Sequence, residues 1–174
     1  MHRRYGKYRG IVTQPLDTDM GGKLAALVTV GGSAMPVVAE ACTPFAGATG
    51  GFFAMPPVGA GVWIEFEEGD VNKPVWTGCW WPQGQLDTAL GTGSTSLDTL
   101  PVMLQSILGN RLVLGSAPDD CVILETALGE AGPRIVMTSV GIKLSVGETA
   151  AVELGPDGVM INGNALTVKP PVLG

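Results

Sequence analysis

The sequence contains little charge: charged residues make up 15% of its 174 residues, whereas hydrophobic residues make up 45%. A chain this apolar can bury a core, so the composition excludes an intrinsically disordered protein. The few charges are mostly acidic, with 16 Asp and Glu against 10 Lys and Arg and a net charge of −6. This balance argues against a nucleic-acid partner held through its phosphates.

The residues that build most catalytic and metal sites are also scarce. The single histidine, His2, leaves no Ser-His or Cys-His couple for nucleophilic catalysis. Cys42, Cys79 and Cys121 are far apart and lack CxxC spacing, so neither a zinc site nor a disulfide framework is predicted. We therefore expect no catalytic, cofactor-binding or metal-binding residues, no cofactor and no enzymatic activity.

Long hydrophobic runs are missing as well. Residues 24–39 are apolar enough to suggest the core of a signal peptide, but Gly31 and Gly32 interrupt them and Asp17 and Asp19 precede them. We interpret this segment as strands. The chain is expected to assemble in the cytoplasm without a signal peptide, where its thiols stay reduced.

Glycine and proline are abundant, with 26 and 13 residues. Helices do not tolerate this density of breakers, so short strands and turns are predicted. In residues 61–67, Val62, Ile64 and Phe66 alternate with more polar side chains, which is the period of a strand with two different faces. A turn at 68–74 leads to a second strand at 74–80. Earlier strands are predicted at 8–13, 23–30 and 35–42, and this series favours a small closed β-barrel.

The barrel segment carries two clusters that could bind a ligand. Glu65, Glu67, Glu68 and Asp70 are the densest carboxylates, and we interpret them as a solvated outer face rather than a glycosidase pair. The tryptophans could stack sugars or bases, as OB-fold barrels often do, but packing in the barrel wall or at a subunit interface is the favoured interpretation. They are Trp63, Trp76, Trp80 and Trp81.

Basic residues cluster at the start of the chain. Two interpretations stay open: a solvated tail, or a docking end for an acidic partner surface. The cluster consists of His2, Arg3, Arg4, Lys7 and Arg9.

From residue 100 onward the sequence repeats itself. Residues 102–114 align with 135–146, and blocks of eight then begin at 142, 150, 158 and 166, each with a short strand that in most blocks is followed by Gly. The register is imperfect, because Val159 and Ile161 alternate out of phase with Val152 and Leu154. Regular short strands and turns predict a solenoid or β-helix.

A single file of such strands has no second layer to cover its apolar side chains. Isolated strand pairs are marginal in water, so the file must be buried against other chains. Three copies wound around a common axis would close each apolar face against the other two. At one strand spacing per block, the rod would be roughly 40 Å long.

Several motifs of the first half resemble one known domain. They are YRGIV at 8–12, PFAG at 44–47, MPPVG at 55–59, VWIEFEEGD at 62–70 and KPVWTGCW at 73–80. Together they resemble the N-terminal OB-fold domain of contractile-injection spike proteins. This group includes the phage baseplate assembly protein V family, the central spikes of extracellular injection systems and the VgrG proteins of type VI secretion. The resemblance covers about half the chain and implies that a trimeric β-helical needle follows the barrel.

The resemblance also implies partners. The large hub region that precedes the barrel in VgrG is absent, so a separate baseplate hub protein is expected on the N-terminal side. Residues 82–99 are too short to hold the lysozyme domain of some phage spikes. Residues 168–174 lack His or Cys for a metal-bound tip, so either a separate PAAR-like tip protein caps the C-terminal end or that end is bare.

We therefore predict an all-β protein with an OB-fold domain at 1–82, a linker at 83–100 and an intertwined trimeric β-helical spike at 101–174. The expected function is that of the structural central spike of a contractile injection baseplate, within a phage tail-like particle. It would be a homotrimer that meets the target cell envelope transiently, with effector cargo as a further partner and no nucleic acid. The alternative is an OB-fold module that binds oligosaccharide or single-stranded nucleic acid.

Overall fold

The computed structural model describes residues 3–16, 21–90, 101–115, 121–163 and 165–168. The chain divides into two compact units, Met1–Thr92 and Gly93–Gly174. His2, most of the C-terminal stretch at 168–174 and the Gly/Ser/Thr run at 91–96 lie outside the described residues.

The first unit is a closed barrel of five strands in the order β1-β2-β3-β7-β6. Their bounds are β1 Tyr8–Leu16, β2 Lys23–Val30, β3 Ser33–Ala41, β6 Gly61–Phe66 and β7 Pro74–Trp80. Four neighbouring pairs are antiparallel, and β3 pairs with β7 in parallel. This connectivity and closure confirm the expected OB-fold barrel.

Two irregularities bend the barrel strands. The pairing of β1 with β2 shifts register between Val12 and Gln14, and that of β6 with β7 shifts between Trp63 and Ile64. Such bulges add curvature and twist, which a sheet needs to close on itself. At Gly61, a Cβ atom would lie 2.6 Å from the Trp80 ring, so the close approach of β6 to β7 there requires glycine.

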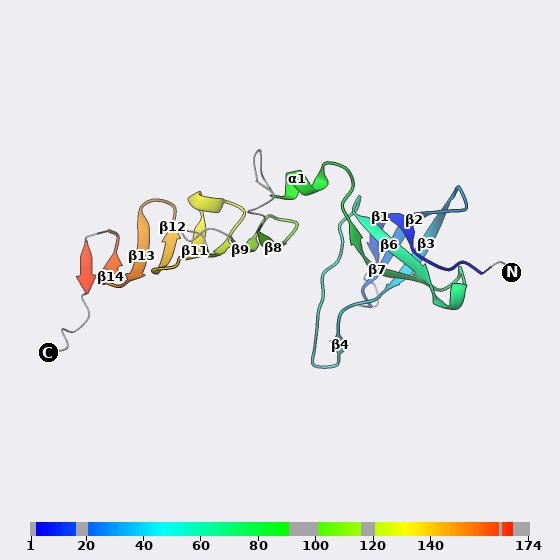
Figure 1. Cartoon of the computed structure of the whole chain (residues 1–174), viewed down its shortest axis with the longest axis horizontal. Helices are drawn as coiled ribbons and strands as arrows, with labels where there is room; N and C mark the ends of the chain where they lie inside the picture. Colours follow the sequence, from blue (N-terminus) through cyan, green and yellow to red (C-terminus); the bar gives the residue numbers. More distant parts are fainter. Residues whose placement is uncertain (1–2, 17–20, 91–100, 116–120, 164, 169–174) are drawn as a thin grey trace. The chain divides into compact units, whose positions relative to one another are not determined.

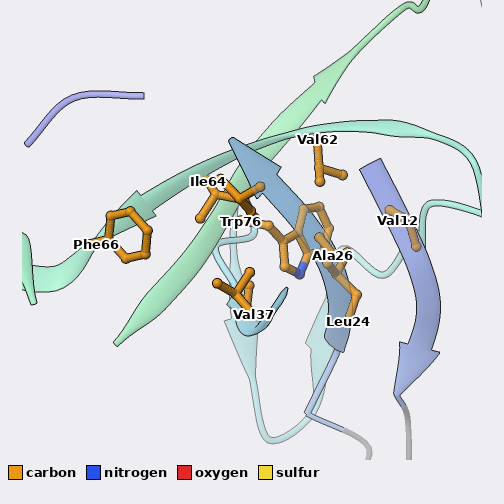
Figure 2. Close-up of a cluster of buried hydrophobic side chains, with 10 residues drawn as sticks. Val12, Leu24, Ala26, Val37, Val62, Ile64, Phe66 and Trp76 are labelled. Atoms are coloured by element: carbon orange, nitrogen blue, oxygen red, sulfur yellow. The ribbon is translucent and has the colours of Figure 1, made fainter. Parts of the chain in front are cut away.

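The barrel core is made of side chains that point inward at every second position of its strands. Figure 2 shows Trp76 among Val12, Leu24, Val62 and Ile64, with their side chains directed toward one another. Leu24, Val62 and Ile64 are fully buried. The alternation read from residues 61–67 therefore predicted the inward face of β6 correctly.

Between β3 and β6 the chain forms an arm that carries a small hairpin, β4 Ala46–Gly47 with β5 Gly50–Gly51 (Figure 1). Residues 43–54 contain no charged side chain. Phe45, Phe52 and Phe53 on this arm are all exposed. After β7, the segment predicted to be a linker contains a short helix, α1 Gln85–Leu90, which the glycine-rich composition did not predict.

The second unit is one sheet of eight strands in sequence order, each antiparallel to the next (Figure 1). The strands are β8 Val102–Gln105, β9 Arg111–Leu114, β10 Val122–Glu125, β11 Pro133–Met137, β12 Ile142–Val146, β13 Ala150–Gly155, β14 Gly158–Ile161 and β15 Leu166–Val168. The last four strands begin at the block starts predicted from the repeat, at 142, 150, 158 and 166. The repeat is thus a meander of hairpins in single file.

The sheet also explains the imperfect register of the repeat. Val152 pairs with Ile161, and Leu154 pairs with Val159. Antiparallel partners share a face of the sheet, so these four side chains lie on the same side. The apparent change of phase arises from turn length: three residues separate Val146 from its partner Ala150, whereas two separate Gly155 from its partner Gly158.

Candidate functional site

One face of the C-terminal sheet is apolar from its first strand to its last. Ile135, Leu144 and Val152 illustrate it, since Leu144 on β12 pairs with both of the others. The pairing register places the following residues on this apolar face: Val102, Leu104, Leu112, Leu114, Val122, Leu124, Pro133, Ile135, Met137, Ile142, Leu144, Val146, Ala150, Val152, Leu154, Val159, Ile161, Leu166 and Val168.

The apolar face is open to solvent within one chain. Leu144, at the middle of the sheet, is 42% exposed, and Val102 on the first strand is 69% exposed. By contrast, Leu24 and Ile64 in the barrel core are 0% exposed. Exposed apolar patches larger than a few hundred Å² are rare on soluble monomers and mark interaction surfaces.

The opposite face of the sheet is mixed, with aliphatic and charged side chains. Lys143 on β12 and Glu153 on β13 are cross-strand partners, and their Nζ and Oε1 atoms lie 2.9 Å apart. Charged groups are costly to bury unless they are paired, so this face suits water better than the other. The two faces therefore have different roles: the apolar one needs a partner surface, and the mixed one faces outward.

A charged clamp lies on the mixed face near the start of the sheet. Glu125 on β10 pairs in register with Arg111 on β9 and with Arg134 on β11. Its Oε1 contacts Arg111 Nε, and its Oε2 lies 3.1 Å from Arg134 Nε. Glu125 is only 5% exposed, so the two guanidinium groups provide its charge compensation.

The clamp was not identified from the sequence. The available signal was a charged residue at the same end of three strands that are otherwise mostly apolar. Arg134 also contacts Glu130, with 3.1 Å between Nη1 and Oε1, so the cluster extends into the turn before β11. The clamp fixes the relative register of three consecutive strands, because a slip would leave a buried charge unpaired.

The turns of the meander form two lateral edges. We call edge one the side of the turns after β8, β10, β12 and β14, and edge two the side of the connections after β9, β11 and β13. Edge-one turns are linked along the stack: Asn110 Oδ1 accepts a hydrogen bond from Ala127 N–H, and Gly132 O accepts one from Gly147 N–H. These bonds connect successive hairpins through their turns, in addition to the backbone hydrogen bonds between the strands.

The barrel tryptophans occupy three environments. Trp76 is in the core and donates its indole N–H to Gly22 O at 3.0 Å. Trp63 and Trp80 pack together on the outer wall, with the Arg9 guanidinium 5.5 and 4.8 Å from their ring centroids. Trp81 is exposed. Arg9 thus covers the two rings that were the best candidates for stacking a ligand.

The basic and acidic residues of the barrel partly engage one another. Lys7 Nζ lies 2.7 Å from Glu65 Oε1 and also donates to Thr77 Oγ1. The Arg9 guanidinium lies over the rings of Trp63 and Trp80. Of the clustered carboxylates, only Glu65 is on strand β6, because Glu67 begins a 3-10 turn at Glu67–Gly69. The period-two pattern was extended one residue too far there.

The barrel and the sheet contain few side chains suited to metal binding or thiol chemistry. No group of three or more His, Cys, Asp and Glu in that part of the chain is placed to hold a metal ion. Cys42 and Cys79 are exposed free thiols, and partial burial raises the pKa of Cys79. The Cys121 side chain has intermediate exposure. None of the helices in the described ranges is long and apolar enough to cross a membrane.

Comparison with protein families matches both units. Residues 8–81 match the model of the type VI secretion system and phage-baseplate injector OB domain. Residues 101–167 match the phage baseplate V C-terminal trimerisation domain. No curated protein matches the chain significantly.

The second match indicates what covers the open apolar face. A trimerisation domain brings three copies of the same sheet together, so the apolar face of each copy packs against those of the other two. The chain is therefore a homotrimer. Its two matched units, in this order, are those of a spike-like structural part of a phage tail-like particle. The chain belongs to the phage baseplate V family of injector proteins.

Proposed function

We propose that the protein is a non-enzymatic central spike of a contractile injection baseplate. Three copies form one rod, which joins the hub and tube to the tip that pierces the target envelope. The observation that carries this proposal is the apolar face, which runs without a polar residue across all eight strands of the second unit.

Strand length supports a narrow rod built from three sheets. A strand of four to six residues spans about 13–20 Å. A triangular prism with sides of about 15 Å leaves roughly 4–5 Å from each sheet to the axis, which is the reach of one aliphatic side chain. A four-sided prism would leave about 7–8 Å and a hollow axis, which apolar side chains disfavour.

The same arrangement accounts for a mechanical role. Successive strands are joined by backbone hydrogen bonds along the stacking direction, and the clamp and the edge-one bonds reinforce the first half of the sheet. A continuous ladder around a dry, close-packed axis resists bending, because bending would open voids or break ladder bonds. Sheath contraction would transmit its force through such a rod to a small area.

The N-terminal and C-terminal units would bind different partners. A baseplate hub protein would contact the barrel side, and a PAAR-like tip protein would cover the last strand, β15, whose outer edge is free within the described part of the sheet. Effector cargo would travel with the spike, and the target envelope would be met only during injection. No catalytic step is assigned to any residue.

The test compares the full chain with a variant that ends before residue 101. We expect the full chain to sediment as a trimer, at three times its 17.9 kDa mass, and to resist heat and detergent. Particles assembled with the truncated variant should lack a functional spike and fail to inject. Unchanged trimer formation and particle assembly by the truncated variant would refute the proposal.

The same preparation tests the alternative function, a module that binds oligosaccharide or single-stranded nucleic acid. A monomer whose tryptophan fluorescence responds to either ligand at micromolar concentration would favour the alternative. A trimer without such a response favours the spike. Arg9→Ala is the matched variant, because it uncovers the Trp63 and Trp80 rings and so favours the stacking of a ligand on them.

A further inference from the structure

The turns of the C-terminal sheet divide into two groups along its length. In the first half, the turns after β8, β10 and β11 carry large aliphatic side chains, whereas the connection after β9 lies mostly outside the described residues. These side chains are among the most exposed of the described residues: Ile107 is 75%, Leu108 78%, Leu128 68% and Val140 72% exposed. In the second half the turns contain Gly147, Glu148 and Thr149, then Pro156 and Asp157, then Asn162 and Gly163. Turn tips are normally polar, so the aliphatic tips require a reason.

The apolar face does not supply that reason, because these residues lie beyond the strand ends, at the lateral edges of the sheet. Ile107, Leu108 and Leu128 are on edge one, and Val140 is on edge two. A side chain at an edge reaches neither the axis of a trimer nor the centre of its own sheet. Something must cover it from the side.

Threefold symmetry determines which surfaces meet at the sides. In a parallel trimer around an axis, contacts are heterologous, so edge one of each copy meets edge two of the next copy. Edge-one and edge-two turns alternate along the stack, one strand spacing apart, at about 4.8 Å. The turn at 126–132 lies between β10 and β11, and the turn at 138–141 lies between β11 and β12. These turns are therefore at neighbouring levels on opposite edges.

We propose that two aliphatic turns form a corner contact between copies in the first half of the trimeric rod, with Leu128 of each copy packed against Val140 of the next copy. The occupant of this edge is thus a second copy of the chain, since the contact continues the interface that the apolar face makes with the same neighbour. The inference rests on the trimeric rod of the proposed function. It adds a lateral contact that the apolar face does not require.

The corner contact explains why Leu128 is held in a defined position. Its turn is tight: a Cβ atom on Gly132 would lie 2.4 Å from Thr126 Oγ1 and 2.7 Å from Leu128 Cβ. Asn110 Oδ1 also binds the backbone N–H of Ala127, next to Leu128. On edge two, Thr138 Oγ1 accepts hydrogen bonds from Val140 N–H and Gly141 N–H. Both tips are therefore presented on ordered turns, which lowers the entropy lost on packing.

The test is disulfide trapping in the full-length trimer with its native cysteines replaced by Cys42→Ser, Cys79→Ser and Cys121→Ser. In that background, Leu128→Cys with Val140→Cys should form covalent trimers under mild oxidation, visible at three times the chain mass in denaturing gels. Disulfides need Cα atoms about 4.4–6.8 Å apart, so trapping reports direct contact. Each single variant should stay uncross-linked, because edge one does not meet edge one.

Two matched variants decide the outcome. Leu128→Cys with Glu148→Cys places both thiols on edge one and should give no covalent trimer. Leu144→Cys alone places three thiols around the axis and should give covalent dimers. Cross-linking through Leu144→Cys without cross-linking of the 128–140 pair would overturn the corner contact and leave the trimer intact. Failure of both would overturn the trimeric rod itself.

Discussion

The two units use the same alternation of apolar and polar residues but bury it differently. In the barrel, the inward side chains of β2 and β6 meet across one chain, so Leu24 and Ile64 are fully buried. In the C-terminal sheet, the corresponding side chains of Leu144 and its neighbours stay open until other copies arrive. Alternation therefore predicts a two-faced strand but does not reveal which chain provides the opposite layer.

Local irregularity accounts for this difference. The barrel has register shifts next to Val12 and at Trp63, together with Gly61, and these let the sheet curve until its edges join. Across the described strands of the second unit, the pairs keep one continuous register. A meander without bulges cannot close on itself, so its apolar face is completed by symmetry.

The largest expected effect comes from a charge on the apolar face. Leu144→Asp would place three carboxylates around one dry axis, and each unpaired buried charge costs several kcal/mol. We expect loss of the trimer at micromolar concentration, measured by sedimentation, while near-UV circular dichroism of the barrel tryptophans is retained. Ser145→Asp on the opposite face, beside Arg134, is the control and should stay trimeric. A stable Leu144→Asp trimer would contradict the inward placement of this face.

A cavity in the barrel core should destabilise the barrel and leave the trimer intact. Ile64→Ala removes a fully buried side chain, which costs about 2–5 kcal/mol. The barrel transition in thermal unfolding should move to lower temperature, with the trimer unchanged by sedimentation. Leu27→Ala, on the outer side of β2, is the control and should have a much smaller effect. Dissociation of the Ile64→Ala trimer would mean that the two units depend on each other.

Removing the centre of the charged clamp should have an intermediate effect. Glu125→Ala leaves Arg111 and Arg134 without their shared carboxylate, and we expect about 2–3 kcal/mol of destabilisation per chain, below the upper range for buried pairs because Arg111 is partly exposed. Denaturant unfolding of the trimer would measure it. Glu153→Ala breaks the more exposed pair with Lys143 and should cost less than about 1 kcal/mol. Equal losses of stability in the two variants would show that the clamp stabilises the sheet no more than the exposed ion pair does.

The smallest effect concerns the Cys79 thiol in the barrel wall. Partial burial raises its pKa, so at pH 8 less of it is thiolate than for a free cysteine. Alkylation by iodoacetamide should be several-fold slower in the native protein than in urea, and the difference should narrow as the pH rises above the native pKa. Mass spectrometry of the Cys79 peptide follows the reaction. A native rate equal to that in urea would show that this wall is fully solvated.

Much of this architecture could be read from the sequence. The strands at 23–30 and 74–80 and the block starts after Gly141 match the structure, because glycine, proline and period-two patterns act locally. The need for partner chains also followed from the apolar residues of the repeat. The closing pairs of the barrel and the clamp of Glu125 could not be derived, because they depend on which strands become neighbours. The hairpin on the arm with Phe52 and Phe53 was not predicted, because its two strands of two residues are too short to show a pattern.

The meander has one more consequence, for the order of events during assembly. The described strands of the second unit pair with their neighbours in sequence, so these contacts are short-range and the hairpins can form quickly. Their apolar face, however, is buried only when three chains meet, which is a slower and concentration-dependent step. Synthesis of many copies near one another would shorten the time for which the unprotected face is available to wrong partners.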